Sequence, residues 1–175
     1  HAEGRSTRAV GANSHSEGTS TSANGNTSHA EGRNTLANGG FSHAEGDATS
    51  AMNSSSHAEG SGTTASGISS HAEGLGTISE GHYTHVEGVK TLARNNAEHA
   101  SGYYNLSIRG GNQSVESLVT NPQATLFTVG NGVSEGTRRN TFDIRWNGDI
   151  HLGNPTINPT LYVDNINCTF DCGDY

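Results

Sequence analysis

The sequence has little of what builds a hydrophobic core within one chain. Only 30% of its 175 residues are hydrophobic, many of these are Ala, and aromatic residues make up 6%. A large globular core is therefore excluded. Charged residues are also scarce at 15%, and there are three Pro, which is unlike the composition of a disordered chain. We expect stability to come from regular stacking or from partner chains.

Long apolar runs, basic clusters and a cysteine framework are missing as well. No segment approaches the roughly 20 apolar residues that cross a bilayer, so we predict no membrane insertion. The formal charge of −8 is spread without a basic cluster, which argues against nucleic acid as a partner. Cys168 and Cys172 lack the second pair typical of a zinc site, so a disulfide or free thiols are favoured over a metal. The sequence opens on His1 without a signal peptide, and we expect it to be a piece of a longer polypeptide.

What the sequence does contain is a regular internal repeat. His recurs without a slip at positions 1, 15, 29, 43, 57, 71, 85 and 99. The typical unit reads HAEGxxT and then xAxGxxS, which places two Gly in 14 residues. In a helix each Gly would cost about 1 kcal/mol against Ala, and no apolar stripe compensates for that. The repeat therefore predicts a parallel β-solenoid of 14 residues per coil, with two short strands per coil and about 4.8 Å between coils.

The alternation of side chains along a strand assigns the faces of each coil. The shared Ala of each half-unit, such as Ala58, is expected inside the narrow coil. The positions beside the second Ala vary freely, as at Leu36, Met52 and Arg94, and are expected to face solvent. His and Glu repeat without drift although they point outward, which is typical of a surface that contacts another copy of itself. We call this predicted interface the ladder: His15, Glu17, His29, Glu31, His43, Glu45, His57, Glu59, His71, Glu73, His85 and Glu87.

Two departures from the repeat carry expectations of their own. Asn53 and Asn95 replace the second Gly of their units. Asn tolerates the left-handed backbone better than other non-Gly residues, so these positions are expected at left-handed corners. The unit at His99 has Ser101 in place of Glu, which we expect to mark the end of the roll.

The ladder also admits chemical interpretations, which the residues favour less. Three His from three chains could meet at one metal ion per coil, but metal sites rarely repeat at every coil and a hydrogen bond satisfies Glu beside His. Glycoside cleavage needs two carboxylates in distinct environments, which identical coils do not supply. No GxSxG turn accompanies the many Ser and His residues. We predict no catalytic residue, no metal and no cofactor.

At the level of families, the run SHAEGRNTLANGGFSHAEGDATSAMNSSSHAEG resembles the 14-residue head repeats of YadA-like trimeric adhesins, in the variant found in phage and prophage tail or neck appendage proteins. LFTVGNGVSEGTRRNTFDIRWNGDIHL is similar to the segment that follows those repeats. The resemblance covers roughly residues 1–152 and implies a homotrimer of left-handed parallel β-rolls. CGDY at the end resembles the start of the family's self-cleaving chaperone domain, which implies that a chaperone follows or was removed.

These observations together predict an all-β chain with four parts. Residues 1–104 form the β-roll, 105–123 are transition loops, 124–152 form a β module with a hairpin at Asn147-Gly148, and 153–175 are extended. The predicted function is a trimeric shaft or spike of a phage tail appendage. Its expected location is the virion or a cell surface, and its expected partners are other virion appendage proteins and a host glycan or protein receptor. The alternatives are a bacterial trimeric surface adhesin and a tailspike enzyme acting on surface polysaccharide.

Overall fold

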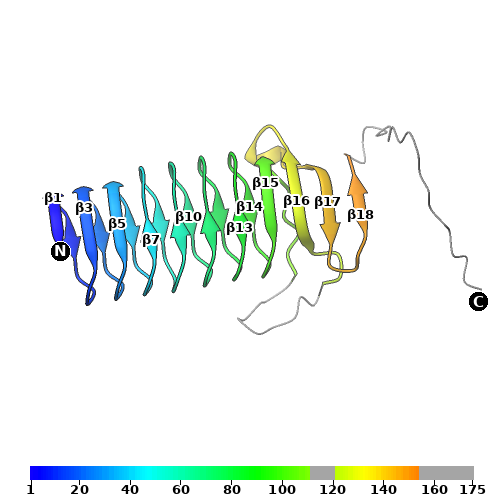
Figure 1. The fold of residues 1–175 in the computed structure, drawn as a ribbon. Helices are drawn as coiled ribbons and strands as arrows, with labels where there is room; N and C mark the ends of the chain where they lie inside the picture. Colours follow the sequence, from blue (N-terminus) through cyan, green and yellow to red (C-terminus); the bar gives the residue numbers. More distant parts are fainter. Residues whose placement is uncertain (111–120, 154–175) are drawn as a thin grey trace, which may run out of the picture.

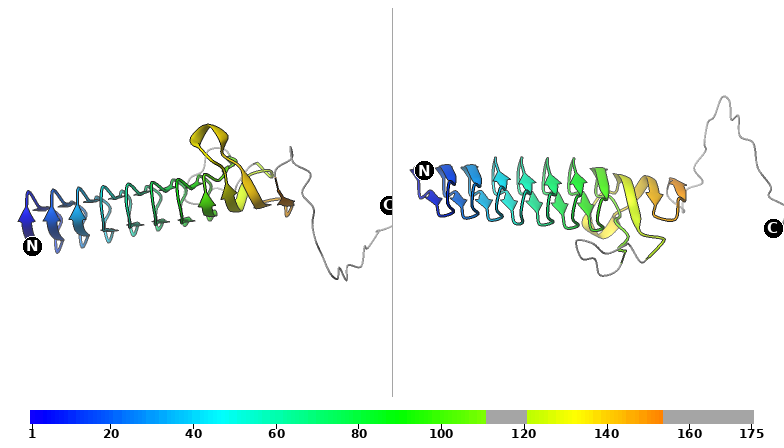
Figure 2. Two further views of the ribbon diagram at one scale, coloured as in Figure 1. Left: turned by 90° about the horizontal axis from the view of Figure 1, so that it is seen from above. Right: turned by 60° about the horizontal axis from the view of Figure 1, so that its bottom comes forward.

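The computed structural model describes residues 1–110 and 121–153, which form a rod of stacked coils followed by a small β module (Figure 1). Two sheets run along the rod, one of 11 strands and one of seven. The views in Figure 2 show that the coils follow one another in a straight line. Cys168, Cys172 and the predicted extended segment after residue 153 lie outside the described residues, as does part of the predicted transition.

Strand lengths differ between the two sheets. Sheet A contains β1 (Ala2–Arg5), β3 (His15–Thr19), β5 (His29–Arg33), β7 (His43–Ala44), β9 (His57–Ala58), β11 (His71–Ala72), β13 (His85–Val86), β15 (His99–Tyr103), β16 (Thr125–Asn131), β17 (Asn140–Arg145) and β18 (Ile150–Leu152). Sheet B contains β2 (Arg8–Ala9), β4 (Ser22–Ala23), β6 (Leu36–Ala37), β8 (Ser50–Ala51), β10 (Thr64–Ala65), β12 (Ile78–Ser79) and β14 (Leu92–Ala93). A short 3₁₀ helix, η1 (Glu135–Thr137), lies between β16 and β17. No helix among the described residues is long and apolar enough to span a membrane.

Within the roll each strand pairs in parallel with its counterpart in the next repeat unit. His57 lies opposite His71 in sheet A, and Thr64 lies opposite Ile78 in sheet B. The backbone N–H of His57 donates to the carbonyl of Ser70, 2.9 Å away, and equivalent bonds recur from coil to coil. The predicted parallel β-solenoid with one repeat unit per coil is therefore confirmed.

The interior of the roll is a column of small side chains. The Ala residues at the second and ninth positions of the repeat unit, from Ala23 to Ala100, are fully buried, and Ala58 is one of them. The Thr residues at the seventh position, from Thr21 to Thr91, are buried as well, and Thr63 is one of these. Ser56 and the equivalent Ser residues are buried as well, and the Ser56 hydroxyl donates to the backbone carbonyl of Asn53. The prediction that Ala faces inward and His and Glu face outward is correct. The interior of the regular coils consists mainly of small side chains, so each coil buries little apolar area.

The two Gly of each unit serve different purposes. Gly60 has a φ of 98°, which is the left-handed region, and a Cβ there would lie 2.3 Å from the carbonyl oxygen of Gly74. Gly67 is not left-handed, yet a Cβ would lie 1.8 Å from the carbonyl oxygen of Gly81. The expectation that the second column, Asn53 included, occupies left-handed corners is therefore wrong. At the Gly positions of this column a side chain would meet the backbone of the next coil, because consecutive coils approach closely there, whereas Asn53 and Asn95 show that two coils accommodate a larger residue.

Other residues fill the left-handed corners. They lie at the sixth and thirteenth positions of the unit, and Phe41 and Tyr83 are among them, with φ of 58° and 59°. This backbone is uncommon for bulky residues. Both side chains are more than half exposed, so they meet no neighbour that would oppose the corner.

The β module continues sheet A beyond the last regular coil. Strand β16 pairs in parallel with β15, which places Phe127 opposite His99. Strands β17 and β18 then add in antiparallel fashion, and the predicted hairpin is present, with a φ of 88° at Gly148 in its turn. The loss of Glu at Ser101 therefore does not end sheet A. Sheet B ends at β14.

Candidate functional site

The His column of the ladder is a stack of imidazole rings on the outer face of sheet A. From His15 to His71 consecutive ring centroids lie 4.6–4.9 Å apart with interplanar angles of 4–11°. His71 and His85 meet edge-on, and His85 and His99 are stacked again. The ring of Phe127 continues the stack 5.0 Å beyond His99. Parallel pairing produces this stack because equivalent residues lie one above the other.

The Glu column runs beside the His column and lines a groove. The groove has a volume of about 580 Å³ and is lined by Glu31, Gly32, Glu45, Gly46, Glu59, Gly60, Glu73, Gly74, Glu87 and Gly88. Each Glu in this lining is followed by a Gly, so no side chain lies beside the carboxylate on the Gly side. The structure therefore places ladder residues from five coils along one continuous surface.

His and Glu pair across coils and not within them over most of the ladder. Nε2 of His71 lies 3.5 Å from Oε1 of Glu59, and Nε2 of His57 lies 3.8 Å from Oε1 of Glu45. His43, His85 and His99 approach the Glu of the preceding coil in the same way. Among the described residues, the pairs at the N-terminal end, His1 with Glu3 and His15 with Glu17, lie within one coil. The ladder therefore links neighbouring coils.

Neighbouring carboxyls of the Glu column shift one another's pKa values. Side-chain hydrogen bonding with Glu73 and then Glu45 raises the pKa of Glu59 to about 7. Hydrogen bonding with Glu59 lowers the pKa of both Glu45 and Glu73 below its ordinary value, while a bond with Glu45 raises the pKa of Glu31. From Glu31 to Glu73 the direction of the pKa shift thus alternates, which relieves the repulsion expected for stacked like charges.

The imidazoles are held toward the neutral form. Burial, followed by the charge of neighbouring His residues, lowers the pKa of His57, His71 and His99 below its ordinary value. The Nε2 atoms of His29, His43, His57 and His71 are shielded from solvent and have no hydrogen-bond partner among the described residues. Buried polar atoms are normally satisfied. The nearest acceptors are Glu oxygens of the preceding coil, 3.5 Å from Nε2 of His71 and 3.8 Å from Nε2 of His57.

The ladder brings together groups with the composition of a metal site. The side chains of His57, Glu59 and His71 place one ligand atom each within 4.8 Å of one another, and three further groups combine one His with two Glu. The rings of His57 and His71 are almost parallel at 10°. An imidazole binds a metal in the plane of its ring, so two parallel rings cannot both bind one ion without turning. The donor set is suitable, but the ring geometry favours stacking over chelation.

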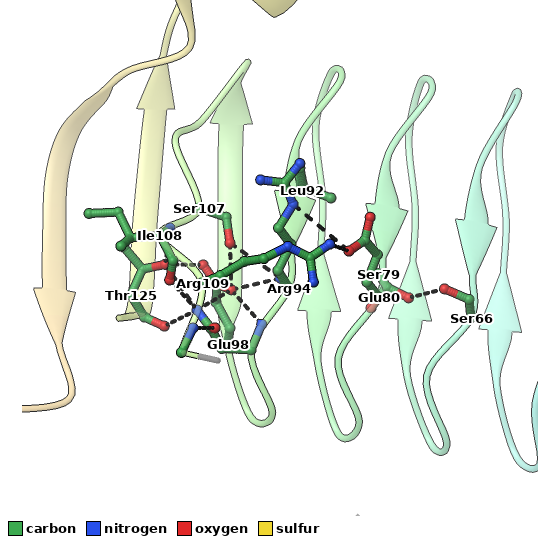
Figure 3. A network of polar contacts seen from close by, with 12 residues as sticks. Ser66, Ser79, Glu80, Leu92, Arg94, Glu98, Ser107, Ile108, Arg109 and Thr125 are labelled. Atoms are coloured by element: carbon green, nitrogen blue, oxygen red, sulfur yellow. Dashed lines mark hydrogen bonds and ion pairs between the residues drawn. The ribbon is translucent and has the colours of Figure 1, made fainter. Parts of the chain in front are cut away.

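A buried carboxylate ends the regular coils, and sequence reasoning missed it. Glu98 takes the column position of Ser56 and its equivalents, and its side chain is fully buried (Figure 3). Oε2 accepts from the backbone N–H of Arg94 and of Asn95 and from the hydroxyl of Ser107, and Oε1 accepts from the hydroxyl of Thr125. Burial raises the pKa of Glu98, while these donors oppose the shift. The signal in the sequence is a lone Glu in a column of Ser and Thr.

Asn105 closes the last coil from the other side. Its Oδ1 accepts from the N–H of Leu92, and its Nδ2 donates to the carbonyl of the same residue. In an earlier coil the equivalent N–H, that of Leu36, donates to the backbone carbonyl of Thr49 in the next coil. The side chain of Asn105 therefore replaces backbone groups where sheet B stops.

No protein-family model matches this chain, and a search of curated proteins finds no relative. The functional argument therefore rests on the geometry of the ladder and on the resemblance of the repeat.

Proposed function

We propose that this chain forms a trimeric, non-catalytic shaft or spike whose protomers meet along the ladder. The observation that carries the proposal is the unbroken outward face of His and Glu, which repeats in register from coil to coil along sheet A. A surface that varied freely would be expected if it faced only water. Here the surface is the most regular part of the outside of the roll.

The energetics of the roll support an assembly of several chains. Burial contributes about 25 cal/mol per Å² of apolar surface, and the interior of each coil offers mainly one Ala per strand. A small apolar interior leaves a single roll marginal, and burial of further surface between chains adds stability that depends on association. Three chains are the number that the resemblance of the repeat implies.

The place of the shaft follows from the resemblance alone. We infer a tail appendage of a phage or prophage, exposed on the virion, that contacts other appendage proteins and a glycan or protein receptor on the host. The straight, repetitive rod is suited to spanning distance (Figure 2).

Several features of the Glu column argue against hydrolysis. The carboxyls of Glu45, Glu59 and Glu73 bond to one another, so their pKa differences come from these bonds. A retaining glycosidase keeps its two carboxyl groups about 5–5.5 Å apart, with the sugar between them. Side chains bonded to each other leave no such space, and the same pattern repeats from coil to coil.

Sedimentation equilibrium of the purified protein tests the proposal. We expect a trimer with no folded monomer at concentrations where circular dichroism detects sheet structure. A folded monomer would refute the ladder as an obligate interface. Incubation with surface polysaccharide, followed by analysis of reducing ends, tests the absence of catalysis, because released fragments would require an active site.

A further inference from the structure

A pocket of about 500 Å³ lies in the β module, and none of its residues belongs to the ladder. Arg138, Arg139 and Arg145 line it, with Leu106 and Ile108 on an apolar part of the wall. Three of the nine Lys and Arg residues of the chain therefore gather at one pocket, although the formal net charge is −8. Pockets of this size hold small molecules, and a few convergent polar groups orient the ligand.

The carboxylate of Asp143, which lines the pocket, already accepts hydrogen bonds from neighbouring side chains. Asp143 is 7% exposed, and its Oδ1 accepts from Nε of Arg145 at 3.2 Å. Its Oδ2 accepts from Nδ2 of Asn140 at 3.4 Å. Asp143 therefore pairs with Arg145 and forms no ion pair with the other two guanidinium groups.

Arg138 and Arg139 have no carboxylate partner in the described ranges 1–110 and 121–153. Nη1 of Arg138 donates to the backbone carbonyls of Lys90 and Asn105, and the guanidinium lies 5.5 Å from the centroid of the Tyr104 ring. Nε of Arg139 donates to the backbone carbonyl of Asn131 at 3.0 Å. These bonds fix both side chains but neutralise neither charge. Partial burial lowers the pKa of Arg138, and the charge of Glu135, which is not within ion-pair distance, opposes that shift only in part.

His151 adds a further donor at the pocket. Its Nε2 is shielded from solvent and has no hydrogen-bond partner in the described part of the chain. An imidazole nitrogen that carries a proton can donate to an anion. The pocket thus combines two guanidinium groups that form no ion pair among the described residues, one ring nitrogen without a hydrogen-bond partner there, and an apolar wall.

We propose that this pocket binds a small anionic ligand, in which a carboxylate or phosphate group is held by Arg138 and Arg139 and the body of the ligand lies against Leu106 and Ile108. The guanidinium fork matches both kinds of anion, because each offers two oxygens to parallel N–H donors. An acidic sugar or a sugar phosphate has this chemistry. The inference does not depend on the number of chains in the assembly.

Titration calorimetry of the intact protein with glucose 6-phosphate and with glucuronate tests the site, and separates phosphate from carboxylate recognition. We expect at least one of them to bind, while glucose does not. Arg139→Gln removes one fork and is expected to weaken binding about tenfold. Arg8→Gln is the matched control, because Arg8 is exposed in β2, makes no side-chain hydrogen bond among the described residues and has the same charge. Its binding is expected to stay within about twofold of the parent.

Three results would overturn the site. The first is no binding of either anion at millimolar concentration. The second is an equal loss in Arg139→Gln and Arg8→Gln, which would mean that only net charge matters. If Arg139→Gln fails to fold, Arg139→Lys takes its place, because it keeps the charge and removes the guanidinium fork. The third result is then undiminished binding in Arg139→Lys. Sedimentation of the same samples reports separately on the trimer, so the two proposals fail independently.

Discussion

Nε2 of His71 lies 3.5 Å from Oε1 of Glu59, which belongs to the preceding coil. His57, the His of the same coil as Glu59, approaches Glu45 instead, at 3.8 Å. The ladder therefore consists of pairs that join adjacent coils along the rod. Each pair therefore couples the register of one coil to that of the next.

The first prediction follows from this pairing. We expect the coupling free energy between positions 59 and 71 to exceed that between positions 59 and 57 by about 0.5 kcal/mol or more, because only the first pair is in ion-pair contact. Thermal unfolding of the single variants Glu59→Gln, His71→Ala and His57→Ala and of the two double variants gives both cycles. Equal coupling in the two cycles would contradict the cross-coil pairing.

The fold could be predicted from the sequence because a parallel coil repeats its residues in register. A small residue, usually Ala, that recurs between two outward positions has one place in such a coil, and the structure places Ala58 there. The outward position of His and Glu follows from the same alternation. The sequence does not predict which Glu each His contacts, because that depends on the side-chain conformation between two coils.

Two other features escaped prediction for identifiable reasons. Phe127 continues the His stack, but its distance from His99 along the sequence is twice the period of the repeat, so the intervening segment hides the relationship. Glu98 stands at the last position of the repeat unit, where the other units have Ser or Thr. A single substitution of this kind is easily taken for random variation of the repeat. Its role depends on donors from Ser107 and Thr125, which are distant in sequence.

The second prediction concerns the interior. Ala58→Leu should destabilise the protein by about 1–3 kcal/mol or more, because Ala58 is fully buried and the coil has no space for three further carbons. Met52→Ser lies on the outer face, where Met52 is 38% exposed, and should change stability by less than about 0.5 kcal/mol. Thermal or denaturant unfolding compares the two. Similar losses at both positions would show that the faces are misassigned.

The third prediction concerns the buried carboxylate. Glu98→Ala leaves the N–H groups of Arg94 and Asn95 without their acceptor, and should cost about 2–4 kcal/mol. Hydrogen exchange should show loss of protection around β14 and β16, with the first coils unaffected. Glu80→Ala, at an exposed ion pair with Arg109, is the control and should cost under about 1 kcal/mol. Uniform loss of protection along the whole roll would argue that Glu98 is not a local closure.

The last prediction uses the alternation of carboxyl pKa values along the groove. The folded pKa of Glu59 is raised to about 7, so between its ordinary value of 4.5 and 7 the folded state holds a proton that the unfolded state has released. Stability is therefore lost as the pH rises through this window. Glu59→Gln cannot ionise and should become more stable than the parent as the pH passes from 4.5 to 7, by a few degrees in Tm at pH 8, since Glu59 is partly exposed and screened.

Glu45→Gln is the matched variant with the opposite sign. The folded pKa of Glu45 is lowered, so its carboxylate contributes stability above pH 4.5 that is lost as the pH falls. The variant should therefore be less stable than the parent at neutral pH. The lowered pKa values of His57 and His71 cost stability below about pH 6.5. Glu45 itself raises the pKa of His57, so the two variants are compared between pH 7 and 8, where the His residues are largely neutral. Tm measured in this range decides the matter, because differences of the same sign for both variants would mean that the carboxyls are equivalent and do not shift one another's pKa values.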